Sequence, residues 1–428
     1  MNTQYYPELD ETLCREVLEN GLTVCVIPRK GFTKKLAYFV TDYGSIHTEF
    51  TLEGKSHTTP AGVAHFLEHK MFDLPGQRDV SAEFAALGAS TNAFTSYDMT
   101  AYYFSCTENF DQCLNLLLEF VSTPYFTEES VAKEVGIIVQ EIGMNLDAPD
   151  SVVFENLVQG LFENHPIRVP ILGSSESIRK ISAQTLYDCH RAFYTPGNML
   201  LCVIGDVDPA SVTAAARRVL GMEKRPVARK VTHWEEPQAS VRREAQDAME
   251  VAMPMFELAF KHDALGRGEA SIRQEMVADL AAEALFGESS SLYQSLYEQG
   301  IIDTSFGGGF ETIDGLAMFT ASGDSNDPNA VVDAILQRAK ELVESGLDEA
   351  DFLRMKRSAM GRRIRSLDSF DATCYRICAY HLSGFDYFNF PAVYRDITAE
   401  EVRRFLEESS TQERMSLAVI IPNEEVSQ

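Results

Sequence analysis

The chain has 428 residues, of which 45% are hydrophobic, and its formal net charge is −27 at pH 7. This charge argues against nucleic acid as a partner, because binding to phosphates requires a basic surface. No apolar stretch is long enough to span a membrane and residues 1–7 lack the features of a signal peptide, so we expect a cytoplasmic protein. The length exceeds that of most single hydrophobic cores and predicts two domains.

The predicted elements form two halves in which strands and helices follow one another in a similar order. In the first half we expect strands at 22–28, 35–41, 92–105 and 199–204, and helices around 63–72, 81–87, 109–148, 151–163, 182–193 and 209–220. In the second half we expect strands at 251–261, around 304–322 and at 415–421, and helices at 271–286, 329–345 and 349–365. This order predicts an α+β fold of two structurally similar domains, each a mostly antiparallel sheet packed with helices.

A polar stretch that contains proline separates the two halves. Residues 223–237 include Pro226 and Pro237 among charged and polar side chains, a composition typical of linkers. We therefore predict a first domain at 1–222, a linker at 223–237 and a second domain at 238–428.

Eight cysteines are spread thinly along the chain. They form no C-x-x-C pair, and we expect reduced, mostly buried thiols. Cys374 and Cys378 are four residues apart, but no cysteine or histidine pair close to them in the sequence completes a metal site.

The pattern H-x-x-E-H occurs once, as His65, Glu68 and His69. Residues four apart lie on one face of an α-helix, so both imidazoles can reach the same metal ion. Glu68 lies on the same side and can contact a water molecule at that ion. The pattern is typical of zinc hydrolases of the inverted type, and it predicts that His65 and His69 bind zinc while Glu68 acts as the general base.

The alternative is a chance match on an exposed helix. The flanking residues argue against it, because Val63, Phe66, Leu67 and other apolar side chains make the segment largely hydrophobic. Buried histidines require partners, since a buried polar group without one is costly.

A catalytic zinc site needs at least one further protein ligand. In the predicted helix that begins after Thr127, Glu134 and Glu141 are seven residues apart and therefore share a face. One of them could bind the metal and the other could orient a histidine, and spacing alone leaves open which does which. The alternative is an amphipathic helix with two surface glutamates.

Several segments together resemble the pitrilysin/insulysin family of zinc peptidases, which includes the mitochondrial processing peptidases and their bacterial half-length relatives. The resemblance is strong through the first half and weaker in the second. It is carried by residues 61–72, by Glu134 and Glu141, by 91–95, 171–173, 194–199 and 203–207, and more weakly by 285–287 and 290–293.

The resemblance implies a role for each matching residue. Glu141 would be the third zinc ligand, and Glu134 would support the site without binding the metal ion itself. Asn92 and Ala93 would contact the substrate backbone. The resemblance also implies one Zn²⁺ per chain and half of a four-domain clamshell, so that the chain works as a dimer.

The second half departs from the family pattern. It has no H-x-x-E-H, so we expect one metal site per chain. Tyr297 stands where the family has an arginine and Asp303 where it has a tyrosine, residues that bind substrate and stabilise the tetrahedral intermediate. The departure predicts either a homodimer without these groups or a heterodimer with a related subunit that supplies them. The alternatives are that a neighbouring residue substitutes for them or that the register is shifted.

Two functions remain in view at this point. The favoured one is a zinc-dependent metalloendopeptidase that hydrolyses peptides or short unfolded segments inside a dimeric chamber. The alternative is a non-catalytic scaffold or assembly subunit of a peptidase-like heterodimer, since folds are readily reused for other functions. The retained motif favours the peptidase.

Overall fold

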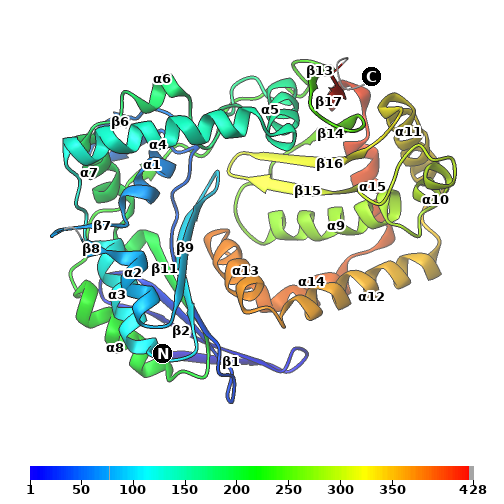
Figure 1. Cartoon of the computed structure of the whole chain (residues 1–428). Coiled ribbons are helices and arrows are strands. Elements are labelled where there is room, and N and C mark those ends of the chain that lie inside the picture. Colours follow the sequence, from blue (N-terminus) through cyan, green and yellow to red (C-terminus); the bar gives the residue numbers. More distant parts are fainter. Residues whose placement is uncertain (77, 424–428) are drawn as a thin grey trace.

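The fold was analysed in a computed structural model that describes residues 1–76 and 78–423 (Figure 1). The first half builds a seven-stranded sheet in the order β1-β2-β3-β11-β4-β10-β9. All neighbours in this sheet are antiparallel except β3 and β11, which run parallel. The strands are β1 (Asn2–Tyr6), β2 (Glu11–Val17), β3 (Thr23–Pro28), β4 (Lys35–Thr41), β9 (Ser90–Thr95), β10 (Thr100–Cys106) and β11 (Met199–Gly205).

One face of this first sheet is covered by helices of the same half. Alternate strand residues such as Val24, Phe39 and Tyr102 pack there into one hydrophobic core. The covering helices are α1 (Val63–Lys70), α2 (Val80–Ala86), α3 (Phe110–Ser122), α4 (Glu128–Leu146), α6 (Ser175–Ile178), α7 (Ala183–Phe193) and α8 (Pro209–Leu220).

The second half builds a five-stranded sheet in the order β13-β17-β14-β16-β15. Its strands are β13 (Glu244–Met249), β14 (Met255–His262), β15 (Gly307–Ile313), β16 (Leu316–Asp324) and β17 (Met415–Pro422). Helices of this half pack around it: α9 (Glu269–Phe286), α10 (Ser291–Glu298), α11 (Pro328–Ser345), α12 (Glu349–Ser366), α14 (Phe390–Asp396) and α15 (Ala399–Ser409). Two mixed units of helices and sheet confirm the predicted fold class.

Each half also lends one helix to the other sheet. α5 (Pro149–Leu161) packs through Val153 and Leu157 on β14 and β17 of the second sheet. α13 (Phe370–Leu382) packs on β4 and β11, against the face of the first sheet that its own helices leave open. Figure 1 shows α13, in orange, between the two sheets. The predicted boundary at 223–237 stays a prediction, and this exchange shows that the halves share their cores.

Smaller elements complete the chain. β12 (Arg229–Lys230) pairs with β5 (Glu49–Leu52), which pairs with β6 (Lys55–Thr58), while β7 (Asp73–Leu74) pairs with β8 (Arg78–Asp79). Single 3₁₀ turns lie at Pro166–Arg168, Pro196–Asn198, Tyr387–Asn389 and Gln412–Arg414. Within the described ranges no helix combines the length and the apolar character needed to cross a membrane.

An ionic cluster joins the two halves near β12. The Arg267 guanidinium donates to the carboxylates of Asp42 and Asp314, and the Lys230 ammonium lies 2.6 Å from Asp42 Oδ1. Burial alone would raise the pKa of Asp42, but the hydrogen bonds from Arg267 and the charge of Lys230 outweigh it and lower this pKa. The cluster therefore stays ionised and holds the first sheet, β12 and the β15–β16 turn together.

Some predicted elements are divided or begin elsewhere. The single strand predicted at 92–105 is the hairpin β9–β10, and the helices predicted between 109 and 148 are α3 and α4. The strand predicted from 251 begins at Met255, because Pro254 has no N–H to donate to the ladder. The short strands β1, β2 and β13 and the helices α10, α13, α14 and α15 were not predicted.

Candidate metal centre

α1 carries three of the candidate residues and is held mainly by packing. Val63, Phe66 and Leu67 face the core, and the helix follows Gly62, whose φ is 87°. A Cβ at Gly62 would lie 2.4 Å from the carbonyl oxygen of Leu172, so only glycine allows this close approach. His65 and Glu68 are 7% and 8% exposed, which places both side chains at the floor of the site.

α4 supplies the two candidate glutamates. The helix begins at a capping box, in which the Thr127 hydroxyl accepts from the Ser130 N–H at 3.1 Å, as the sequence predicted for Thr127. Val131, Ile138 and Ile142 are buried against the first core and set the rotation of the helix. Glu134 and Glu141 consequently face α1.

The two histidines and Glu141 converge. His65 Nε2 lies 3.6 Å from Glu141 Oε1, and His69 Nε2 lies 3.8 Å from Glu141 Oε2. One ligand atom from each of the three residues lies within 4.8 Å of the others, an arrangement that can hold a metal ion. Two imidazole nitrogens and one carboxylate form a donor set that suits zinc, and three protein ligands are typical of a catalytic rather than a structural site.

Glu134 contacts the opposite side of the His69 ring. Its Oε1 lies 3.0 Å from His69 Nδ1, and its Oε2 lies 3.8 Å from the ammonium of Lys70. When Nδ1–H donates a hydrogen bond to Glu134, the lone pair on Nε2 is directed toward Glu141 and is available to a metal ion as a neutral ligand. Lys70, 2% exposed, also pairs with Asp73 and was not singled out from the sequence.

The pKa values of the two histidines shift in opposite directions. Burial lowers the pKa of His65 to about 4, so that at neutral pH this imidazole carries a free lone pair for a metal ion. The hydrogen bond to Glu134 raises the pKa of His69. A metal ion at this site would therefore compete with a proton for His69.

Glu68 is positioned as a proton acceptor beside the convergent ligands. Its Oε2 accepts a hydrogen bond of 2.8 Å from the Thr95 hydroxyl, at the end of β9. Burial raises the pKa of Glu68, and the bond from Thr95 and the neighbouring His69 oppose this rise. Its Oε1 is left to exchange a proton, the property that a general base requires.

The strand that contains Asn92 and Ala93 lies at the edge of the first sheet. Among the residues that the structure describes, β9 pairs only with β10, which leaves its other edge free. The Ala93 N–H donates to the side-chain oxygen of Asn92 at 2.9 Å, and the N–H is therefore not part of the β9–β10 ladder. This edge, which ends at Thr95 beside Glu68, can accept an added strand.

Tyr297 and Asp303 lie in the second half, at the end of α10 and shortly after it. Tyr297 is 49% exposed. Asp303 Oδ1 accepts from the N–H and the hydroxyl of Ser305, at 2.8 and 2.6 Å, and these bonds lower the pKa of Asp303. Tyr297 has only a neutral hydroxyl where the family pattern has a cationic arginine, and the anionic Asp303 has no donor where that pattern has a tyrosine.

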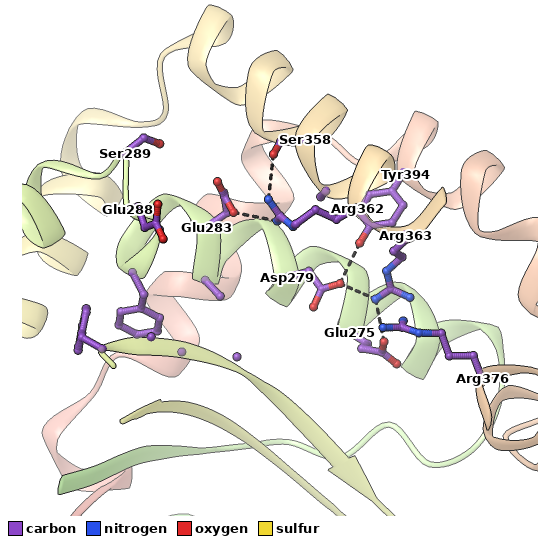
Figure 2. A pocket seen from close by; sticks show the side chains of 18 residues that line it. Glu275, Asp279, Glu283, Glu288, Ser289, Ser358, Arg362, Arg363, Arg376 and Tyr394 are labelled. Atoms are coloured by element: carbon purple, nitrogen blue, oxygen red, sulfur yellow. Dashed lines mark hydrogen bonds and ion pairs between the residues drawn. The ribbon is translucent and has the colours of Figure 1, made fainter. Parts of the chain in front are cut away.

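A separate cavity of about 860 Å³ lies between α9, α12 and β15 (Figure 2). Its charged side chains are largely paired with one another: Arg363 with Asp279 and Glu275, and Arg362 with Glu283 at 2.8 Å. The residues that line it include none of those at the His–His–Glu group. We assign its ionic network to the packing of α9 against α12.

Family models match most of the chain. The model described as Insulinase (Peptidase family M16) matches residues 54–175, which include α1, β9 and the candidate ligands. The model described as Peptidase M16 inactive domain matches residues 180–359. This second description is consistent with the absence of H-x-x-E-H from the second half of the sequence.

Similar proteins support the same grouping. An uncharacterized zinc protease of Bacillus subtilis, YmfH, is 36% identical over 425 residues, covering 97% of this chain and 98% of that protein. The crystal structure of an M16-like peptidase from Alicyclobacillus acidocaldarius has a TM-score of 0.92 at 32% identity and covers 96% of this chain and 99% of that one. A protease from Helicobacter pylori, with a TM-score of 0.82 at 19% identity over 96% and 99% of the two chains, shares the fold.

Proposed function

The chain belongs to the M16 insulinase family of peptidases, and on this basis we propose that it is a zinc-dependent endopeptidase. The proposal is carried by one observation: His65, His69 and Glu141 offer ligand atoms within 4.8 Å of one another, and Glu68 lies beside them. The cofactor we propose is one Zn²⁺ per chain, held by these three residues. Zinc in such a site supplies Lewis acidity, which activates water and polarises the peptide carbonyl.

Each residue of the chain then has a defined part. Glu68 would take a proton from the attacking water at Oε1 and pass it to the leaving amine. The Thr95 hydroxyl, 2.8 Å from Oε2, holds the carboxylate in place while this happens. Glu134 fixes the ring of His69 through Nδ1, which keeps Nε2 directed at the ion.

The free edge of β9 supports the proposed class of substrate. A peptide in extended form would add a strand at Asn92 and Ala93, and main-chain pairing accepts many sequences. Only chains that can extend locally can pair in this way, so peptides and short unfolded segments are the expected substrates. We also propose that the working form is a dimeric chamber, in which a related subunit supplies the groups missing at Tyr297 and Asp303.

The scaffold alternative has less support. A non-catalytic subunit has no need of a base beside three convergent ligands, and here Glu68, Thr95 and Glu134 are all in place around them.

The proposal is tested by Glu68→Gln. The amide keeps the shape and cannot accept the proton, so we expect one zinc per chain by elemental analysis and a peptide-cleavage rate reduced by about 10²- to 10⁴-fold. Glu129→Gln, at an exposed position in the first turn of α4, is the matched control and should keep both the metal and the rate. A Glu68→Gln protein that cleaves peptides at the wild-type rate would refute the assignment of the base.

A further inference from the structure

Four cysteines meet where α13 crosses the first sheet. Cys202 on β11 is directly opposite Cys25 on β3 in the parallel pairing. Cys374 and Cys378 lie one turn apart on α13, which packs on β11, and all four side chains are buried. The sequence alone could not pair Cys374 and Cys378 with other cysteines, because the cysteines that they approach lie on distant strands. Cys202 and Cys374, for example, are 172 residues apart.

One pair within this thiol cluster is in contact. The sulfur atoms of Cys202 and Cys374 are 3.7 Å apart, within hydrogen-bond distance of each other. A disulfide bond is about 2.05 Å long, so the two atoms need to approach by roughly 1.6 Å. Rotation about the Cα–Cβ bonds of the two cysteines is the movement that would bring these atoms together.

The surroundings make Cys202 the more acidic of the two. Hydrogen bonds from the Cys374 and Cys378 thiols, with the nearby Arg15 guanidinium, lower the pKa of Cys202 to about 5 against the opposing effect of burial. Burial raises the pKa of Cys374 well above its usual value. Since the thiolate is the nucleophile in thiol chemistry, Cys202 is the group that would react first.

We propose that Cys202 and Cys374 form a redox-sensitive site, at which hydrogen peroxide closes a disulfide between the first sheet and α13. The Cys202 thiolate attacks one peroxide oxygen, the O–O bond breaks, and the released hydroxide takes up a proton, leaving a sulfenic acid. Cys374 then attacks this sulfur, the S–O bond breaks, the S–S bond forms and a second water leaves. Two thiols lose two electrons in total, and one peroxide is reduced to two waters.

Burial selects the oxidant. Peroxide is close to water in size and can enter during local opening of the packing around α13. Larger disulfides such as oxidised glutathione cannot reach sulfur atoms that are 0% exposed. The site is therefore expected to respond to peroxide and not to thiol–disulfide exchange with the folded protein.

The helix that carries Cys374 also contacts the strand proposed to bind substrate. The next residue, Tyr375, is 44% exposed, and its ring centroid lies 6.0 Å from that of Phe94 on β9. A disulfide at Cys374 would fix this turn of α13 and alter the contact of Tyr375 with β9. This consequence, unlike the disulfide itself, rests on the proposed function, and it predicts a higher KM for peptides after oxidation.

The test uses the full-length protein, reduced and then treated with hydrogen peroxide. Peptide mapping without reductant should show a Cys202–Cys374 link that dithiothreitol removes, and the thermal midpoint should rise by a few degrees, because the bond closes a long loop. Cys374→Ala should abolish the link, whereas Cys378→Ala, a buried thiol one turn away on the same helix, should keep it. Oxidised glutathione should give no link.

Three results would overturn the proposal. They are a folded, peroxide-treated protein without the link, a disulfide that joins Cys202 to a cysteine other than Cys374 in the wild type, and loss of the Cys202–Cys374 link in a folded Cys378→Ala protein. The mapping does not depend on peptidase activity, so it stands whether or not Glu68 is the base. In an active preparation, oxidation should raise KM reversibly in the wild type and leave Cys374→Ala unchanged; a link without any change in KM would refute the coupling to β9.

Discussion

His69 lies between two carboxylates of the same helix. Glu134 contacts Nδ1 at 3.0 Å, while Glu141 Oε2 lies 3.8 Å from Nε2. The two glutamates are two helical turns apart and reach opposite nitrogens of one ring. Their positions give them different roles. Glu141 lies where it could bind the same metal ion as both histidines, whereas Glu134 can only orient His69 and compensate its charge.

We expect Glu134→Ala to weaken zinc binding without removing any ligand. Loss of such an orienting partner typically costs about 10- to 100-fold in metal affinity or activity. Competition with a chelator of known affinity measures the effect. Glu128→Ala, on the exposed first turn of α4, is the control and should bind zinc as the wild type does. Unchanged zinc retention in Glu134→Ala would show that Glu134 does not support zinc binding.

Spacing within one helix accounts for how much of the site the sequence could predict. His65, Glu68 and His69 lie on α1, so their common face follows from helical periodicity alone. Spacing could not decide between Glu134 and Glu141, because that choice depends on how α4 rotates and packs against α1. The contacts of Lys70 and of the Thr95 hydroxyl could not be predicted from the sequence either, since they depend on packing between elements that are far apart in the chain.

At the scale of elements, β9 joins the candidate catalytic group to a free sheet edge. Its end at Thr95 contacts Glu68, and its middle presents the Ala93 N–H away from β10. A single short strand therefore both supports the base and offers main-chain groups to a peptide. The Asn92 side chain occupies the Ala93 N–H and would have to release it when a substrate pairs.

Ala93→Pro should lower kcat/KM for extended peptides by about 2- to 10-fold. The substitution removes one N–H from the free edge, and a net hydrogen bond contributes about 0.5–1.5 kcal/mol. Ala93→Val keeps the N–H and is the matched control. Peptide-cleavage kinetics, with zinc content and thermal unfolding measured alongside, separate lost binding from lost folding. Equal kcat/KM for the two variants would argue that Ala93 does not pair with substrate.

α5 shows how closely an element of the first half approaches the second sheet. A Cβ at Gly160 would lie 2.2 Å from the Ser416 hydroxyl oxygen on β17 and 3.2 Å from the carbonyl oxygen of Arg242. The helix and the strand can touch only because this residue has no side chain.

Gly160→Val should therefore destabilise the protein by about 1–3 kcal/mol, as overpacked core substitutions do. The control is Gly136→Ala on α4, where an added Cβ meets nothing within 4 Å. That change should stabilise its helix by about 0.5–1 kcal/mol. Denaturant unfolding of both variants is the measurement, and a Gly160→Val protein as stable as the wild type would show that α5 can move away from β17.

At the scale of the whole molecule, each half is built of helices packed on a sheet, but the two halves are not independent. α5 belongs to the predicted first domain and packs on the second sheet, while α13 belongs to the predicted second domain and packs on the first. The hydrophobic pattern of a helix shows that one face is buried and does not show which sheet covers it. The sequence could therefore predict two sheets and most of their helices, but it could not predict this exchange or the cluster of Arg267 with Asp42 and Asp314.

The second half also bears on whether one chain suffices for catalysis. If two copies of this chain formed the chamber, Tyr297 and Asp303 would stand where the family pattern has an arginine and a tyrosine. Hydrogen bonds from Ser305 lower the pKa of Asp303, so its carboxylate is anionic and would repel the oxyanion that forms during peptide hydrolysis. A related subunit that carries both donors would remove this repulsion and add hydrogen bonds to the developing charge.

We therefore expect this chain to cleave peptides poorly alone and far faster when mixed with a homologous subunit that carries the arginine and the tyrosine. Each oxyanion donor typically contributes about 10²- to 10³-fold in rate, so the gain on mixing should be of at least this order. Light scattering on the separate and mixed proteins reports the assembly, and cleavage of an unstructured peptide reports the rate. A partner with its arginine replaced by alanine should still assemble and should lose most of the gain. Equal specific activity with and without the intact partner would show that this chain needs none, and would move the search for oxyanion donors to its own residues.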